Sequence, residues 1–227
     1  MAQRWHDLLF MHWAVPVDVM RALVPDELEL DTFEGRTYIG VVPFRMSGVR
    51  LRFTPALPGI GAFPELNVRT YVTCDGKPGV FFFSLDATNA IAVAAARAWF
   101  KLPYMRARMS LDPERDGWVH YKCERTHKRE PPAEFIARYG PTGDVYTAAA
   151  GTLDHWLTER YCLYTVDRRH RVRRAEVHHA TWPLQPAECE VETNTMTASL
   201  GLDHGGATPL LHFARFMDVV VWLPRRL

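Results

Sequence analysis

The stretch ELNVRTYVTCDGKPGVFFFSL, residues 65–85, decides the fold, because it contains two strand patterns joined by a tight turn. The turn is Asp75-Gly76-Lys77-Pro78-Gly79, whose glycines and proline supply the backbone angles that a hairpin needs. β-branched and aromatic residues fill the strand on each side of the turn. We therefore expect an antiparallel hairpin within a mainly β protein.

The first strand of this hairpin is polar on one face and apolar on the other. Successive side chains of a strand point to opposite faces, so Glu65, Asn67 and Arg69 share one face. The second strand, residues 80–85, is apolar on both faces, which is typical of a strand buried on both sides. Two interpretations of the polar face stay open. It is either a solvated sheet face, or the lining of a cavity in which the arginine keeps a carboxylate ionised or positions it for proton transfer.

The rest of the chain continues the strand pattern, with few helices. Further strands are expected at residues 8–13, 38–44, 49–53, 104–111, 118–125, 162–166, 172–181, 188–196 and 212–223. Helices are expected at residues 16–24, 88–100 and 152–161, a helix or covering loop at 131–139, and a loop at 54–64. The length of 227 residues is compatible with one β-rich domain, so we expect a single domain over residues 1–227 of the α+β class, mainly β.

Charge and hydropathy argue against two classes of partner. The 27 lysines and arginines nearly balance the 26 acidic residues, which leaves no long-range field toward nucleic acid or an anionic membrane. The basic cluster at residues 168–174 alternates with apolar residues at strand spacing, which indicates a solvated strand face. The apolar run at residues 219–223 is too short to cross a bilayer.

Cysteines and cofactor motifs give mainly exclusions. The four cysteines form no CxxC pair, and no secretory leader is recognised, so we expect reduced thiols in a cytoplasmic protein. GxSxG and phosphate-binding loops are absent, and Gly59-Ile60-Gly61 lacks the further glycine of a dinucleotide fingerprint. We expect no cofactor and no bound metal.

Two adjacent histidines, His178 and His179, lie in a strand pattern. Alternation sends them to opposite faces, which argues against both binding one metal. His179 shares its side with Ala175 and Val177, so it is expected to point inward. It is interpreted as a core or cavity histidine, with a general acid or base and a metal ligand as the alternatives.

Five motifs in order carry a resemblance to a known family. They are PELNVRTYV (64–72), GKPGVFFFSLDA (76–87), ARAWFKLPY (96–104), GTLDHWLTERYCLY (151–164) and HHATWPLQ (178–185). Over essentially the whole chain the sequence resembles the YqjF-like proteins, an uncharacterised bacterial family, which is similar in turn to the acetoacetate decarboxylase superfamily. The resemblance implies a barrel of antiparallel sheets around a central cavity, with two or three helices.

The resemblance to the decarboxylases breaks at the residue that does their chemistry. Their helix ends in an arginine, followed six residues later by a proline and then by the Schiff-base lysine. Here Arg97 and Pro103 keep that spacing, but Tyr104 stands in the lysine position and Lys101 falls three residues too early. A nucleophilic lysine must point into a desolvated cavity, so Schiff-base chemistry is not expected.

Of the two cavity glutamates of the decarboxylases, one has a counterpart in this sequence. Glu65 fits a cavity glutamate of the decarboxylases that follows an aromatic residue by two positions, here Phe63, whereas Val80 stands where their second glutamate is expected. The resemblance therefore favours the cavity interpretation of the polar strand face.

Two functional hypotheses follow. In the first, a cavity binds a small, partly apolar molecule with a carbonyl or carboxylate. Any catalysis is then acid/base work, with Glu65 as base and Tyr104 or His179 as donor, while Asn67, Arg69 and Arg97 bind the substrate. In the second, the protein is not a catalyst and its polar residues only satisfy one another, for example Arg97 with Glu65. A homo-oligomer is possible in either case.

Overall fold

The computed structural model describes residues 1–50, 61–88, 101–167, 169–204 and 206–227. Its strands are β1 (Ala2–Val15), β2 (Glu29–Leu30), β3 (Thr37–Arg50), β4 (Phe63–Cys74), β5 (Lys77–Ala87), β6 (Tyr104–Pro113), β7 (Val119–Arg125), β8 (Glu134–Pro141), β9 (Cys162–Val166), β10 (Val172–His178), β11 (Gln185–Asn194), β12 (Leu210–Val221) and β13 (Arg225–Arg226). The helices are α1 (Val17–Leu23), α3 (Leu153–Thr158) and the 3-10 turn η1 (Ala198–Leu200). None of the helices in these ranges is long and apolar enough to cross a membrane.

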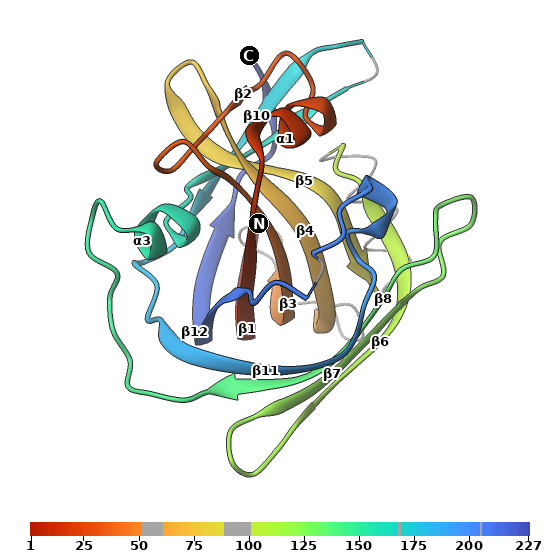
Figure 1. Ribbon diagram of the computed structural model, residues 1–227, viewed down its shortest axis with the longest axis vertical. Helices are drawn as coiled ribbons and strands as arrows, with labels where there is room; N and C mark the ends of the chain where they lie inside the picture. The colour runs from red at the N-terminus through yellow and green to blue at the C-terminus, as the bar shows by residue number, and fades with distance from the viewer. Residues whose placement is uncertain (51–60, 89–100, 168, 205) are drawn as a thin grey trace.

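The strands form a sheet that closes on itself twice. One closure, the first ring, runs through β12, β1, β3, β4, β5, β9 and β10, because β10 pairs back onto β12. The other, the second ring, runs from β5 through β6, β7, β8 and β11 to β12, and returns through β1, β3 and β4. Figure 1 shows β12, β1, β3 and β4 side by side in the middle of the molecule, with β11, β7 and β6 passing below them.

The central strands are buried on both faces, because each face lines a different core. On β1, Leu8 and Phe10 join the core inside the first ring, while Leu9 and Met11 join the core of the second ring. The same alternation divides β4, where Phe63 and Tyr71 belong to the first core and Leu66, Val68 and Val72 to the second. A strand buried on both sides loses the polar-out pattern of an ordinary antiparallel sheet.

Most of the expected elements are confirmed. The hairpin at residues 65–85 is β4 and β5, with partners running from Glu65 and Ala87 to Cys74 and Lys77. The helix predicted after Pro16 is α1, and the one predicted at 152–161 is the shorter α3, which is capped by the Thr152 hydroxyl at the His155 amide.

One expectation is wrong and others fall outside the described residues. In the segment 131–139, only residues 131–133 lack regular structure; residues 134–139 are not a helix or loop but belong to strand β8, in which Phe135, Ala137 and Tyr139 alternate into the second core. That period of two outweighs the local proline signal of the preceding residues. Of the helix predicted at 88–100 only residue 88 is described, and of the loop at 54–64 only residues 61–64.

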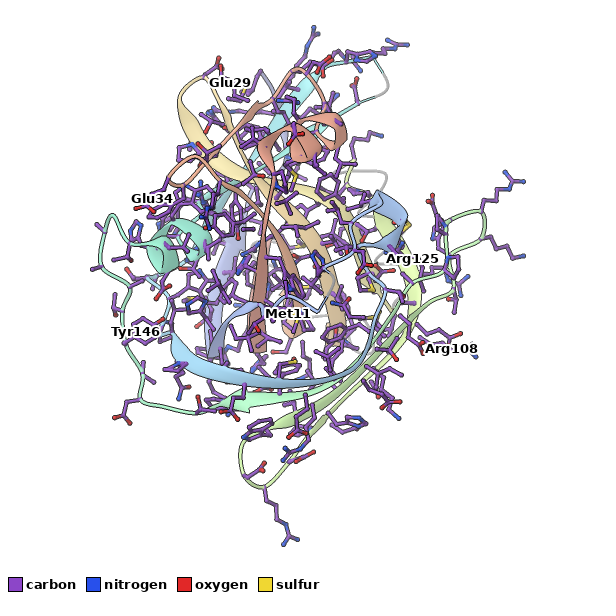
Figure 2. All side chains as sticks on the ribbon, viewed as in Figure 1. Met11, Glu29, Glu34, Arg108, Arg125 and Tyr146 are labelled. Carbon is purple, nitrogen blue, oxygen red and sulfur yellow. The ribbon has the colours of Figure 1, made fainter. Side chains whose placement is uncertain are left out.

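A buried ion pair ties the second ring to the central sheet. Arg125 of β7 donates from Nε and Nη2 to the two carboxylate oxygens of Asp86 on β5, at 2.8 and 2.7 Å. Its Nη2 also donates to the Ser84 hydroxyl at 3.0 Å. Figure 2 labels Arg125, which lies at the right of the view near the outer strands. Both side chains are almost fully buried, so each charge depends on the other.

Removing one partner of this ion pair should destabilise the protein. We expect Arg125→Met to lower the free energy of unfolding by about 3–5 kcal/mol, because it leaves the Asp86 charge buried without its partner. The measurement is urea denaturation followed by circular dichroism. The double variant Arg125→Met/Asp86→Leu removes both charges and should recover most of the loss. A loss below about 1 kcal/mol in the single variant would contradict the assignment of this pair as a structural tie.

Candidate functional site

The polar residues of β4 lie on the inner face of the first ring and not in water. Glu65, Asn67 and Arg69 are only 3%, 5% and 8% exposed. They share their face with Phe63 and Tyr71, which belong to the first core. The solvated interpretation of this face is therefore wrong, and the polar groups are buried in an apolar interior.

Neighbouring strands form three rows across this face. Glu65 lies between Phe44 of β3 and Ala87 of β5, and Asn67 lies between Val42 and Leu85. Next, Arg69 lies opposite Gly40 and Phe82. The register slips between Val68 and Arg69, so that Phe83 is the extra residue on β5.

The carboxyl group of Glu65 is incompletely satisfied. Its Oε2 atom has no hydrogen-bond partner among the residues that the structure describes. Burial above all, together with the nearby Asp86 charge, raises the pKa of Glu65 to about 8, against the lowering effect of a hydrogen bond with the Tyr104 side chain. At neutral pH the group is consequently a neutral acid that holds a proton.

Tyr104 reaches Glu65 because β6 begins beside the end of β5. The two strands run parallel there, with Tyr104 opposite Leu85. Burial raises the pKa of the Tyr104 hydroxyl well above its ordinary value, and the neighbouring Glu65 adds to the rise. The phenol therefore stays protonated and can donate a hydrogen bond. Lys101 is exposed, with a left-handed φ of 57°.

Asn67 and Arg69 carry further bare polar atoms. Within the described ranges, Oδ1 of Asn67 and both Nε and Nη2 of Arg69 lack hydrogen-bond partners. The Arg69 guanidinium instead lies over the rings of Phe10 and Tyr71, at 5.3 and 5.8 Å from their centres. Unpartnered buried polar atoms are costly and usually mark a place that water or a ligand fills.

His179 is buried as expected, but both of its ring nitrogens already contact backbone carbonyls. Nδ1 lies 2.7 Å from the Ala180 carbonyl and Nε2 lies 3.2 Å from the Arg160 carbonyl. The ring also stacks on Tyr161 at 4.6 Å. Its two nitrogens are thus held by backbone, as in a core histidine. Arg97, the remaining predicted residue, lies outside the described residues.

Two interior histidines were missed by the sequence reading. His12 of β1 is fully buried, and His212 of β12 is 6% exposed. Both lie on the first-ring face, since Phe10 is the cross-strand partner of His212 and His12 follows Phe10 by two residues. A single histidine within an apolar strand run, LLFMHW or LLHFAR, is the signal that could have found them.

The described residues do not form a recognisable metal centre. In the parts of the chain that the structure covers, no three histidine, cysteine, aspartate or glutamate side chains converge. The four cysteines are free thiols, of which Cys123 and Cys162 are buried.

Solved structures define the class of fold. The chain superimposes on acetoacetate decarboxylase of Legionella pneumophila with a TM-score of 0.61 and 14% identity, covering 100% of this chain and 87% of that one. It also matches the enduracididine biosynthesis enzyme MppR in complex with pyruvate, with a TM-score of 0.66 and 12% identity over 99% and 89% of the two chains. At such identities the likeness defines the fold alone, which is the mainly β acetoacetate-decarboxylase-like fold.

Sequence comparison defines the family. Residues 2–218 match the DUF2071 family, described as an uncharacterised conserved protein. The chain is 46% identical over 226 residues to the uncharacterised protein YqjF of Bacillus subtilis, covering 100% of this chain and 92% of that protein. The chain belongs to the DUF2071 family.

The raised pKa of Glu65 predicts how stability depends on pH. Between the ordinary carboxyl value of 4.5 and about 8, folded Glu65 holds a proton that the unfolded chain has lost. The free energy of unfolding should therefore fall with rising pH in this range, by up to about 1.4 kcal/mol per pH unit from this group. Glu65→Gln removes the titration, so the difference between the two proteins should grow from pH 5 to pH 8.

Urea denaturation of both proteins at half-unit pH steps measures this difference. Other groups titrate equally in the two proteins and cancel. Parallel curves across the range would contradict a buried, protonated Glu65.

Proposed function

We propose that the interior of the first ring binds a small, partly apolar molecule with a carbonyl or carboxylate group. The observation that carries the proposal is the row of buried, unpartnered atoms on one strand face: Oε2 of Glu65, Oδ1 of Asn67, and Nε and Nη2 of Arg69. A cluster whose members satisfied one another would leave no such atoms. The complex of MppR with pyruvate supports the proposal by analogy of fold.

The proposed chemistry is non-covalent proton transfer at Glu65. With a pKa of about 8 the carboxyl group starts as an acid at neutral pH and becomes a base after it has given up its proton. Tyr104, hydrogen-bonded to Glu65, has one proton, so it would hold the carboxyl group before substrate binds and then donate to a substrate oxygen instead. His179 and Arg97 keep the roles of donor and substrate contact only as predictions, and Asn67 and Arg69 are proposed as binding groups.

The alternative is a binding or structural protein without catalysis. It requires the polar groups to be closed off by one another or by fixed water. Arg69 argues against a closed network, since its guanidinium lies over two aromatic rings while its Nε and Nη2 atoms have no acceptor among the described residues. We therefore favour a working binding site.

We further propose a single domain over residues 1–227 that acts in the cytoplasm, without nucleic acid or membrane as partner. Support comes from the free cysteines and the nearly neutral charge. Arg173 and Arg174 of the basic cluster pair with Asp167 and Glu176, respectively. Light scattering at several protein concentrations would test whether the chain forms a homo-oligomer.

A thermal-shift screen tests the proposed site. Small keto acids, lactones, aldehydes and fatty acids are added to the native protein and to Glu65→Gln. We expect one class to raise the melting temperature of the native protein, because a ligand that binds only the folded state stabilises it. The rise should shrink in the variant, and any turnover should fall about 10²–10⁴-fold.

Glu124→Gln is the matched control, because Glu124 lies on the surface with its side chain 52% exposed. It should respond to ligands as the native protein does. If no compound shifts any of the proteins and Glu65→Gln alone is strongly destabilised, Glu65 is a structural group and the proposal fails.

A further inference from the structure

A second group of polar atoms lies at the far end of the same inner face from Glu65. We call it the Arg69 cluster, and it consists of Phe10, His12, Arg69, Tyr71 and His212. The Arg69 guanidinium lies over the rings of Phe10 and Tyr71. His12 lies 6.1 Å from Phe10 and 5.9 Å from Tyr71, measured between ring centres, and His212 is the cross-strand partner of Phe10.

Other arginines of this protein bind carboxylates through Nε and Nη2, the same two nitrogens that have no partner in Arg69. Arg125 clamps Asp86 through Nε and Nη2, and Arg4 does the same to Asp218, at 3.0 and 3.5 Å. Arg69 presents the same pair of nitrogens inside the fold, where no residue in the described ranges accepts from them. Such a planar fork matches a carboxylate with two parallel hydrogen bonds.

The hydrogen bonds of His12 fix which of its ring nitrogens carries the proton. The Tyr71 hydroxyl donates its one proton to the Leu157 carbonyl at 2.8 Å. The contact of 2.6 Å between this hydroxyl and Nε2 of His12 must then be donated by the histidine. Burial and the nearby Arg69 charge lower the pKa of His12 well below its ordinary value, so the ring is neutral. Its Nδ1 is therefore a bare acceptor.

A carboxylate fixes in the same way which ring nitrogen of His212 carries the proton toward its partner. Its Nε2 lies 3.0 Å from Oδ1 of Asp154, whose other oxygen accepts from the Tyr146 hydroxyl at 2.9 Å. Figure 2 labels Tyr146, which lies on the segment leading into α3. A carboxylate only accepts, so Nε2 carries the proton toward Asp154. Nδ1 of His212 is buried and without a partner in the described part of the chain.

Gly40 lets these groups approach one another. It lies between His12 and Arg69 across three adjacent strands. A Cβ at Gly40 would lie 2.9 Å from His12 Cδ2 and Nε2, and 3.5 Å from Arg69 Cγ. The imidazole and the arginine stem thus share the space over a residue without a side chain. The cluster thus holds two bare donors on Arg69, a bare acceptor on His12, and the unpartnered Nδ1 of His212.

We propose that the Arg69 cluster binds the carboxylate end of a hydroxycarboxylate, with the carboxylate on Nε and Nη2 of Arg69 and the neighbouring hydroxyl donating to His12 or His212. This inference rests on the proposed function, whose ligand it defines. A plain carboxylate satisfies only Arg69, because it has no proton to give to the two imidazoles. Glu65 lies four residues along β4, about 13 Å away by strand rise, so the carboxylate end is bound apart from Glu65 and the rest of the ligand points toward it.

The test compares three probes that differ at one carbon: 2-hydroxyhexanoate, hexanoate and 2-oxohexanoate. Calorimetric titration of the native protein should give the tightest binding for 2-hydroxyhexanoate, about tenfold tighter than hexanoate, as one buried hydrogen bond provides. Arg69→Met should weaken all three probes by about 10–100-fold, because it removes two charge-assisted hydrogen bonds. Arg69→Lys keeps the charge but not the fork, and should weaken them less.

The histidines are tested by variants that keep their outer hydrogen bonds. The amide nitrogen of glutamine can replace Nε2, so His12→Gln still donates to Tyr71 and His212→Gln still donates to Asp154. Neither variant retains the Nδ1 acceptor. We expect at least one of them to abolish the preference for 2-hydroxyhexanoate over hexanoate while hexanoate binding stays within about twofold.

The outcomes separate this inference from the proposed function. Binding that depends on Glu65 but is unchanged in Arg69→Met, with no preference for the hydroxy acid, would overturn the hydroxycarboxylate site and leave the proposed function standing. If no probe or screened compound binds the native protein and Arg69→Met is equally or more stable, the bare atoms are filled by water and both proposals fail. Thermal unfolding of each variant confirms that it is folded before titration.

Discussion

The structure depends on one constraint: the central strands are buried on both faces. In the middle of β1, β3 and β4 each residue must fit either the first or the second core, because the side chains alternate and neither face is left to water there. Glu65, Asn67 and Arg69 are consequently buried with unfilled hydrogen bonds, and the pKa of Glu65 is raised. Glu65, Asn67 and Arg69 thus lie where the architecture of the central strands places them.

Sequence reasoning found the elements whose signals are local. The hairpin around Gly76 and the division of β4 into polar and apolar faces follow from turn chemistry and from a period of two. The strand β8 was misread because prolines precede it and its alternation is short. The double closure of the sheet could not be read from the sequence, because it depends on pairings such as β10 with β12 that join distant segments.

The candidate site was predictable in part. Glu65, Asn67 and Arg69 could be grouped from alternation alone. The resemblance aligned Tyr104 with a cavity position, whereas its hydrogen bond with Glu65 needed the structure. The burial of the polar face needed the three-dimensional structure, because periodicity cannot tell a solvated face from one that lines an enclosed ring. His12 and His212 come from strands at opposite ends of the chain, so only their pairing across β1 and β12 brings them together.

The extra residue Phe83 on β5 has a consequence for how this chain can change over evolutionary time. The slip lies between the Asn67 and Arg69 rows, so it is β5 and not β4 that absorbs the irregularity. An insertion of one residue into β4 would instead exchange its two faces, moving charged groups into the second core and Leu66 or Val68 against the Glu65 row. Insertions and deletions should therefore be tolerated in the connecting loops and not in β4. The length of this strand fixes the spacing of its polar groups.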